Sequence, residues 1–133
     1  MDLSELKIKL EFDRITGSIK HHVYSTLGAD RCDEISFFTE KELLNTELEK
    51  VVEMKSILST GGDLPLDGLK DISRSLNKIK IEGYFIGPEE FLHVLYFLRI
   101  SRNTRKYVSD LNREQDNSFE LINGLVKDLF YNN

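Results

Sequence analysis

The stretch TGGDLPLDGLKDI, residues 60–72, decides the fold predicted for this chain of 133 residues. It contains three of the eight glycines and one of the two prolines, and it separates two segments whose apolar residues recur at helical spacing. Two adjacent glycines permit left-handed backbone where a helix ends, and Pro65 fixes the backbone before the next helix. We therefore predict a rigid elbow between two helices. Its residues are Gly61, Gly62, Asp63, Leu64, Pro65 and Leu66.

The same stretch does not match a phosphate-binding loop. In such a loop the pattern GxxxxGK[ST] follows a strand. Gly62 and Gly68 are six positions apart, one more than the pattern allows, and Leu69 stands where the lysine belongs. We expect instead that Asp63 caps nearby N–H groups and that the leucines on either side of Pro65 anchor the elbow. Full burial stabilises such a side chain by about 1.5–3 kcal/mol.

The composition is that of an ordinary globular protein, and the length predicts one helical domain over residues 1–133. Apolar residues make up 40% of the chain and charged residues 31%, with a net charge of −5. No segment approaches the roughly 18 consecutive apolar residues of a membrane helix, and the start MDLSELKIKLEF is unlike a signal peptide. We expect a cytoplasmic protein with no membrane partner. The negative charge argues against a surface that binds polyanions all over, but it allows a local basic patch.

Apolar periodicity predicts an all-α fold, a helical bundle of five or six helices without a convincing strand. The first long helix covers residues 11–27 and stops at Gly28. The next begins at a capping box formed by Thr39 and Glu42 and ends at the glycines of the elbow. A shorter helix follows over residues 66–76. A broad apolar arc after Pro88 predicts the central helix of the core, ending before Asn112, and a last helix covers residues 118–130.

The sequence shows no catalytic, cofactor-binding or metal-binding constellation. Cys32 is the only cysteine, which excludes an internal disulfide and favours a buried filler. His21 and His22 are adjacent and therefore about 100° apart around a helix, whereas histidines that share a metal on a helix are spaced by three or four. Carboxylate pairs such as Glu89 and Glu90 suit a helix surface or a first turn. We predict that this chain is not an enzyme.

Four basic residues lie close together on the helix after Pro88. They are Arg99, Arg102, Arg105 and Lys106. Spacings of three and four place most of them on one helix face, where they could contact a phosphate backbone. The alternative, which we favour, is a solvated face whose charges pair with neighbours such as Asp110 or with another domain.

Several stretches resemble the N-terminal part of MutS-related proteins. They are LEFDRI at residues 10–15, STLG at 25–28, GGDLPLDGLKDI at 61–72 and GPEEFLHVLYFLRISRNTRKY at 87–107. The most similar branch is the bacterial second MutS family, which lacks the mismatch-sensing domain. The elbow is the most specific part of the resemblance. After residue 109 the likeness is one of helical pattern only.

The resemblance implies the beginning of the helical core, or lever, domain that joins a DNA clamp to an ATPase. Members of this family are homodimeric DNA-dependent ATPases with a C-terminal nuclease domain, linked to suppression of recombination and to rescue of collided ribosomes. None of their catalytic motifs is present in these 133 residues. ATP and Mg²⁺ would therefore belong to a missing ATPase domain, and the partners would be the rest of the parent chain and, through it, DNA or the ribosome.

Two functions follow as hypotheses. The first is a non-catalytic structural segment of a MutS-like DNA-binding ATPase, with the possibility that the isolated piece forms a homodimer. The second is a free-standing helical module that binds nucleic acid or a protein through the face from Arg99 to Lys106.

Overall fold

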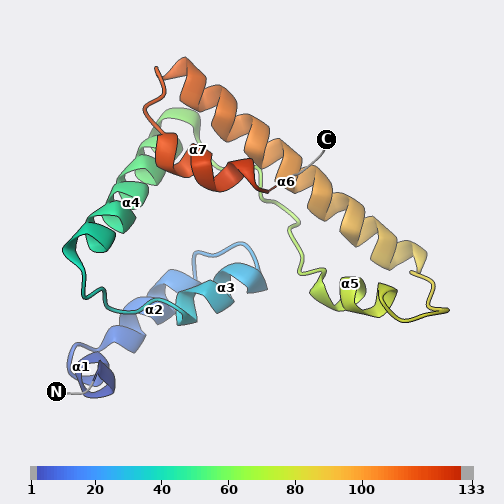
Figure 1. The fold of residues 1–133 in the computed structure, drawn as a ribbon, viewed down its shortest axis with the longest axis horizontal. Coiled ribbons are helices and arrows are strands. Elements are labelled where there is room, and N and C mark those ends of the chain that lie inside the picture. Colours follow the sequence, from blue (N-terminus) through green and yellow to red (C-terminus); the bar gives the residue numbers. More distant parts are fainter. Residues whose placement is uncertain (1–2, 130–133) are drawn as a thin grey trace. The chain divides into compact units, whose positions relative to one another are not determined.

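The computed structural model describes residues 3–129 and contains helices and no strands in that range (Figure 1). This confirms the all-α class, with seven helices in the described range where five or six are predicted. The chain divides into two compact units, Met1–Phe37 and Phe38–Asn133. That the whole chain is one domain stays a prediction. No helix within residues 3–129 combines the length and the apolar character needed to cross a membrane.

The first unit contains three short helices, α1 (Leu3–Lys9), α2 (Phe12–Lys20) and α3 (Thr26–Asp33). The rings of Phe12 and Phe37 lie 4.9 Å apart, centroid to centroid. An ion pair between Lys20 and Asp33 joins α2 to α3. Cys32 is buried, in agreement with its predicted role as a filler.

The single helix predicted over residues 11–27 is wrong. The helix ends at Lys20, and a new helix begins after Ser25, whose backbone is extended with φ −150° and ψ 160°. The Ser25 hydroxyl accepts the N–H of Gly28 at 3.2 Å, so Ser25 is a helix N-cap. Gly28 therefore lies in the first turn of α3 rather than after a helix. The apolar periodicity continues across the break, which is why it does not reveal the cap.

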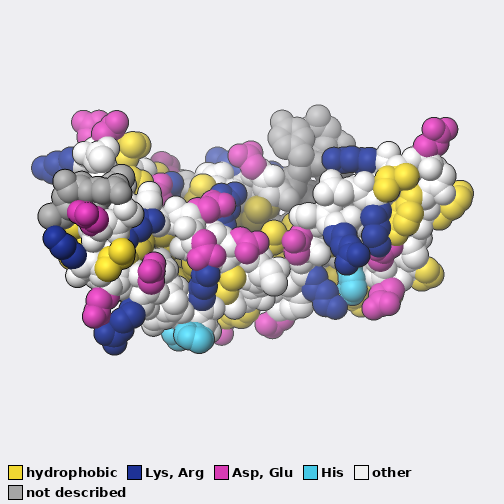
Figure 2. Space-filling view, turned by 90° about the horizontal axis from the view of Figure 1, so that it is seen from below, with side chains coloured by type: hydrophobic (Ala, Val, Ile, Leu, Met, Phe, Trp, Pro, Cys, Tyr) yellow, Lys and Arg dark blue, Asp and Glu magenta, His cyan; other side chains and the backbone are white. Residues whose placement is uncertain are grey.

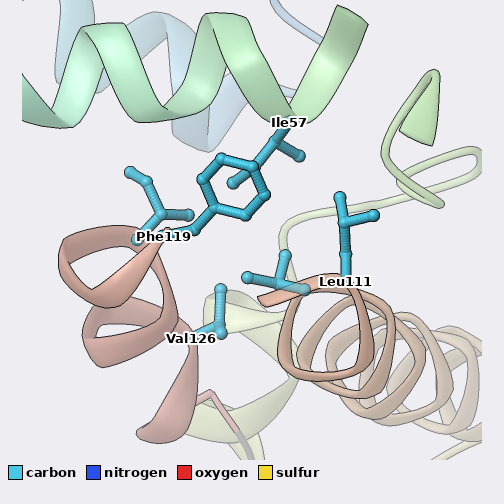
Figure 3. Close-up of a cluster of buried hydrophobic side chains, with 6 residues drawn as sticks. Ile57, Leu111, Phe119 and Val126 are labelled. Carbon is cyan, nitrogen blue, oxygen red and sulfur yellow. The ribbon is translucent and has the colours of Figure 1, made fainter. Parts of the chain in front are cut away.

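The second unit contains α4 (Lys41–Gly61), α5 (Ser73–Ile79), α6 (Pro88–Glu114) and α7 (Glu120–Lys127). Its core lies where α7 packs against both α4 and α6 (Figure 1). Figure 3 shows the side chains of Ile57, Leu111, Phe119 and Val126 pointing toward one another. The complete buried cluster consists of Ile57, Val108, Leu111, Phe119, Ile122 and Val126.

The predicted capping box at the start of α4 does not form. The helix begins at Lys41 with Glu40 at the N-cap, and the N-cap side chain makes no capping hydrogen bond. The predicted end is confirmed, because Gly61 is the last helical residue and Gly62 follows with φ 83°. This left-handed backbone is the conformation for which glycine is the usual residue.

The helix after the elbow begins later than predicted. Residues 62–72 are not helical, and α5 begins at Ser73, whose N–H is accepted by Asp71 Oδ1 at 2.8 Å. The apolar residues from Leu66 to Ile72 have helical spacing but no helical backbone. Pro65 and Gly68, with φ 78° at the glycine, explain the delay because both disfavour a regular helix.

Helix α6 begins as predicted, with Pro88 in its first turn and Gly87 at the N-cap, but it runs without a break to Glu114. Its buried residues are Ser101, Thr104, Val108, Leu111 and Asn112. The predicted apolar arc lies nearer the N-terminus, and its members Phe91, Leu92, Leu95 and Leu98 are exposed. The prediction that this arc forms the centre of the core is therefore wrong within the described residues. Burial depends on where α7 and α4 contact α6, which the apolar pattern does not specify.

Candidate site at the elbow and helix α6

The elbow is held to the buried cluster of the second unit by one of its leucines. Leu64 is half-buried and packs against the buried cluster, and Leu66 is half-buried as well. The N–H of Leu66 donates to the carbonyl of Leu64 at 2.8 Å, which gives the elbow a tight local turn. Asp63 is exposed, and Pro65 is half-buried. That these residues act as a rigid elbow stays a prediction.

The four basic residues of α6 differ in their surroundings. Arg99, Arg102 and Lys106 are exposed, whereas Arg105 is half-buried. Asp110, a predicted pairing partner, instead accepts from Arg113 at 3.1 Å. Within residues 3–129, no carboxylate forms an ion pair with Arg99 or Arg102. These two guanidinium groups are therefore available to an external anion.

A hollow of about 540 Å³ separates the elbow from the middle of α6, and it brings the two predicted groups of residues together. Arg99 lines it from α6, and Pro65 lines it from the elbow. The remaining lining residues are Asp67, Gly68, Lys70, His93, Tyr96, Ile100 and Asn103. In Figure 2, Lys and Arg side chains lie beside a histidine at the right of the view, and Asp and Glu side chains adjoin them.

Lys70 and His93 form the polar contact that links the two walls of this hollow. Lys70 Nζ lies 3.1 Å from His93 Nε2. An ammonium group can only donate, so the imidazole nitrogen accepts in this contact. The contact holds the positive charge of Lys70 beside α6.

A second hollow of about 360 Å³ adjoins the first along α6. Its lining residues are Leu95, Tyr96, Leu98, Arg99 and Arg102. Tyr96 and Arg99 line both hollows and are one helical turn apart, so they form the ridge between them. Neither Arg105 nor Lys106 lines either hollow. The two hollows thus include half of the predicted basic group.

Sequence reasoning missed Lys70, His93 and Tyr96 as members of a site. The spacing of His93, Tyr96 and Arg99 at three-residue intervals places them on one helix face, and this signal was present in the sequence. No local pattern predicts Lys70, because its contact with His93 of α6 depends on how the irregular residues 62–72 fold back along that helix.

A separate polar cluster fastens α5 and the following loop to the start of α6. Lys78 Nζ donates to Glu90 Oε1 at 2.8 Å, and the Tyr84 hydroxyl donates to Glu90 Oε2 at 2.6 Å. These bonds, that of Lys78 first, lower the pKa of Glu90 from 4.5 to about 2. The same contacts raise the pKa of Lys78. Because each oxygen of Glu90 accepts a hydrogen bond from within the chain, we interpret this carboxylate as a structural group.

Within residues 3–129, no group of three or more His, Cys, Asp or Glu side chains is arranged to hold a metal ion. Cys32 is a free, buried thiol, and it lies in the first unit. The hollow at the elbow offers positive charge, an aromatic ring and the side-chain amide of Asn103.

Comparison with known proteins shows which proteins this chain resembles. A MutS2 endonuclease of Geobacillus sp. (strain WCH70) is 30% identical over 110 residues, which are 80% of this chain and 14% of that protein. This chain is similar to a segment of MutS2. The similarity to MutS2 extends to Clostridium botulinum (strain Eklund 17B / Type B), at 30% identity over 117 residues, and to Bacillus cereus (strain B4264), at 27% over 119 residues.

The predicted resemblance is thereby confirmed for a segment of a MutS2-like protein. The chain spans about 14% of the length of these MutS2 relatives. No protein-family model matches the chain, and no solved structure matches it.

Proposed function

We propose that this chain is a non-catalytic structural segment of a MutS2-like protein, equivalent to the beginning of its helical core or lever domain. The similarity to MutS2 over 80–88% of the chain supports this assignment. The helical fold agrees with it, because a lever needs long helices that move as rigid bodies. Helices α4 and α6 contain 21 and 27 residues.

The observation that carries the proposal is the open apolar face of α4. Leu48, Val51 and Val52 are 54%, 56% and 63% exposed, although their spacing gives α4 an apolar stripe. Within the described residues, only Ile57 of this helix is fully buried. Apolar faces of this kind mark surfaces that pack against another partner. In a parent protein of which the matched residues make up only 14%, further helices would cover the stripe.

In this role the segment would transmit the nucleotide state of a distant ATPase to a DNA clamp. Packed helices with discrete arrangements can carry such a change as rigid-body motion. The parent would be a homodimeric DNA-dependent ATPase of DNA repair, recombination control or ribosome rescue, and it would supply the ATP, the Mg²⁺ and the nuclease domain. This chain would contribute packing surfaces and geometry, in the cytoplasm of a bacterium.

The experiment is a split-protein test with a MutS2 relative. The remainder of that relative, lacking the matching segment, is produced with and without this chain. We expect the chain to copurify with the remainder and to raise its ATPase activity. A V51K/V52K variant, which places charges on the open stripe of α4, should abolish copurification, whereas a K55A variant on the same helix should not. Stoichiometric ATP binding by the isolated chain, measured by calorimetry, would contradict the proposal.

A second candidate function is a free-standing module that binds nucleic acid through Arg99, Arg102, Arg105 and Lys106. The unpaired state of Arg99 and Arg102 within the described residues favours it. The expected behaviour is binding that weakens steeply with salt and weakens further in R102A/K106A. Failure of duplex, branched and single-stranded probes to bind at low salt would remove this candidate. Binding to an acidic protein instead would identify the partner as protein.

A further inference from the structure

We propose that the hollow between the elbow and α6 binds an unpaired nucleotide of single-stranded nucleic acid, with the base on Tyr96 and the phosphate between Lys70 and Arg99. The inference deepens the second candidate function and rests on it. It assigns a ligand class to a site that includes Lys70 and Tyr96, which do not belong to the predicted basic group of α6.

The charge of the hollow favours a phosphate. Two fully cationic side chains, Lys70 and Arg99, line it against one carboxylate, that of Asp67. Arg99 has no ion-pair partner within residues 3–129, so its guanidinium can meet an anion without breaking an existing bond. Lys70 is held beside α6 by its 3.1 Å contact with His93. The positive charge on that wall is therefore positioned before a ligand arrives.

The aromatic ring provides the second half of the recognition. Tyr96 is 50% exposed and lines both hollows, so part of its surface is open to a planar ligand. Proteins that bind single strands combine such rings with cationic grooves that follow the backbone. Arg99 is one helical turn from Tyr96, on the same face. A base stacked on the ring would therefore bring its phosphate toward the guanidinium.

The shape of the site favours an unpaired strand over a duplex. A volume of about 540 Å³ lies within the roughly 300–1,000 Å³ of ordinary ligand sites. A base within a duplex is stacked on its neighbours and cannot enter such a hollow without leaving the helix. The amide of Asn103 and the carboxylate of Asp67 line the same hollow and offer hydrogen-bonding groups to the edge of a base.

The test measures fluorescence anisotropy of the full chain with a labelled oligothymidylate of about 12 nucleotides and with a duplex of equal length. We expect tighter binding of the single strand, and roughly tenfold weaker binding in Y96L and in K70A. Y96F keeps the ring and should bind like the unaltered chain. F85L changes an aromatic side chain that is 88% exposed and lines neither hollow, so it is the matched control. Thermal melts establish that each variant is folded.

The other outcomes overturn the proposal in distinguishable ways. Equal affinity for single strand and duplex, or undiminished binding by Y96L, excludes the stacked nucleotide. If R102A/K106A loses binding while Y96L and K70A do not, the basic face binds nucleic acid but the hollow does not. Competition by polyglutamate as effective as that by oligothymidylate would show a general acidic ligand. Absence of all binding at low salt would remove both this site and the second candidate function, while the split-protein test would still decide the MutS2 assignment.

Discussion

A β-carbon on Gly61 would lie 2.2 Å from the hydroxyl oxygen of Tyr107, closer than side chains approach one another in folded proteins. The same atom would lie 3.1 Å from Tyr107 Cζ and 3.0 Å from Leu111 Cδ2. Gly61 is the last residue of α4, and Tyr107 packs against the buried cluster from α6. The missing side chain is therefore what lets the end of α4 meet α6 at the start of the elbow.

The first prediction is that G61A destabilises the second unit and that Y107F partly rescues it. Overpacking of this kind costs about 1–3 kcal/mol, and Y107F removes the closest clashing atom. Urea unfolding of the two single variants and the double variant measures their coupling. If the changes in the free energy of unfolding caused by G61A and Y107F simply add in the double variant, the close approach of Gly61 and Tyr107 is contradicted. G124A is the control, because nothing lies within 4 Å of its added carbon, and it should stabilise α7 by about 0.5–1 kcal/mol.

The second prediction concerns Glu53, which caps α7 from α4. Its carboxylate oxygens accept the N–H groups of Leu121 and Ile122 at 3.2 and 2.8 Å. Hydrogen bonds to charged groups contribute about 1.5–3 kcal/mol, so E53A should lower the free energy of unfolding by an amount in this range. E53Q should cost less, since an amide retains one accepting oxygen.

The control for Glu53 is Glu49, an exposed carboxylate one helical turn earlier on α4. E49A should change the free energy of unfolding by less than about 0.5 kcal/mol. Hydrogen exchange should show faster exchange across α7 in E53A only. If E53A and E49A behave alike, the long-range cap does not contribute to stability.

The contrast between the end of α4 and the start of α5 shows what the sequence could predict. Gly61 and Gly62 predict the end of α4 from local sequence alone, because adjacent glycines after an apolar helical pattern commonly end a helix. This end is confirmed. Pro88 likewise predicts the start of α6 from local sequence, and this start is confirmed. The start of α5 was missed because Leu66, Leu69 and Ile72 have helical spacing in a segment that remains irregular.

Long-range partners were beyond the reach of sequence patterns. Glu53 lies 68 positions before the N–H group of Leu121 that it caps. Asn112, which accepts the N–H of Phe119 at 2.7 Å, is a polar residue buried beside the apolar cluster. In the candidate site, periodicity predicts a helix face that includes Arg99, whereas Lys70 joins the lining of the same hollow only through the fold. Patterns specify faces, and tertiary packing specifies which faces meet.

The third prediction is a pH dependence of stability from Glu90. Its pKa is lowered from 4.5 to about 2, first by the hydrogen bond from Lys78 and then by that from Tyr84. A lowered pKa in the folded state means that the folded state binds protons less readily than the unfolded state. The stabilisation is therefore fully present above about pH 4.5 and is lost as the pH falls toward about 2.

Thermal melts between pH 2 and pH 7 test this prediction. The unaltered chain should lose more stability across the acid range than E90Q, which has no carboxylate to protonate. E89Q, a neighbouring exposed position in the first turn of α6, should keep the acid dependence of the unaltered chain. Identical acid profiles for E90Q and the unaltered chain would show that the Glu90 cluster contributes nothing to it.

The last prediction is that removing a hydroxyl stabilises the protein. Thr104 is 4% exposed on α6, and within residues 3–129 its Oγ1 has no hydrogen-bond partner. A buried polar group without a partner costs about 1–3 kcal/mol, and valine has nearly the same shape and helix propensity as threonine. T104V should therefore raise the free energy of unfolding, by about 1 kcal/mol, as measured by urea unfolding. T104A should be less stable than T104V because it leaves a void of one methyl group. A loss of stability in T104V would mean that the hydroxyl is hydrogen-bonded in solution, by a water molecule or by a rotated side chain.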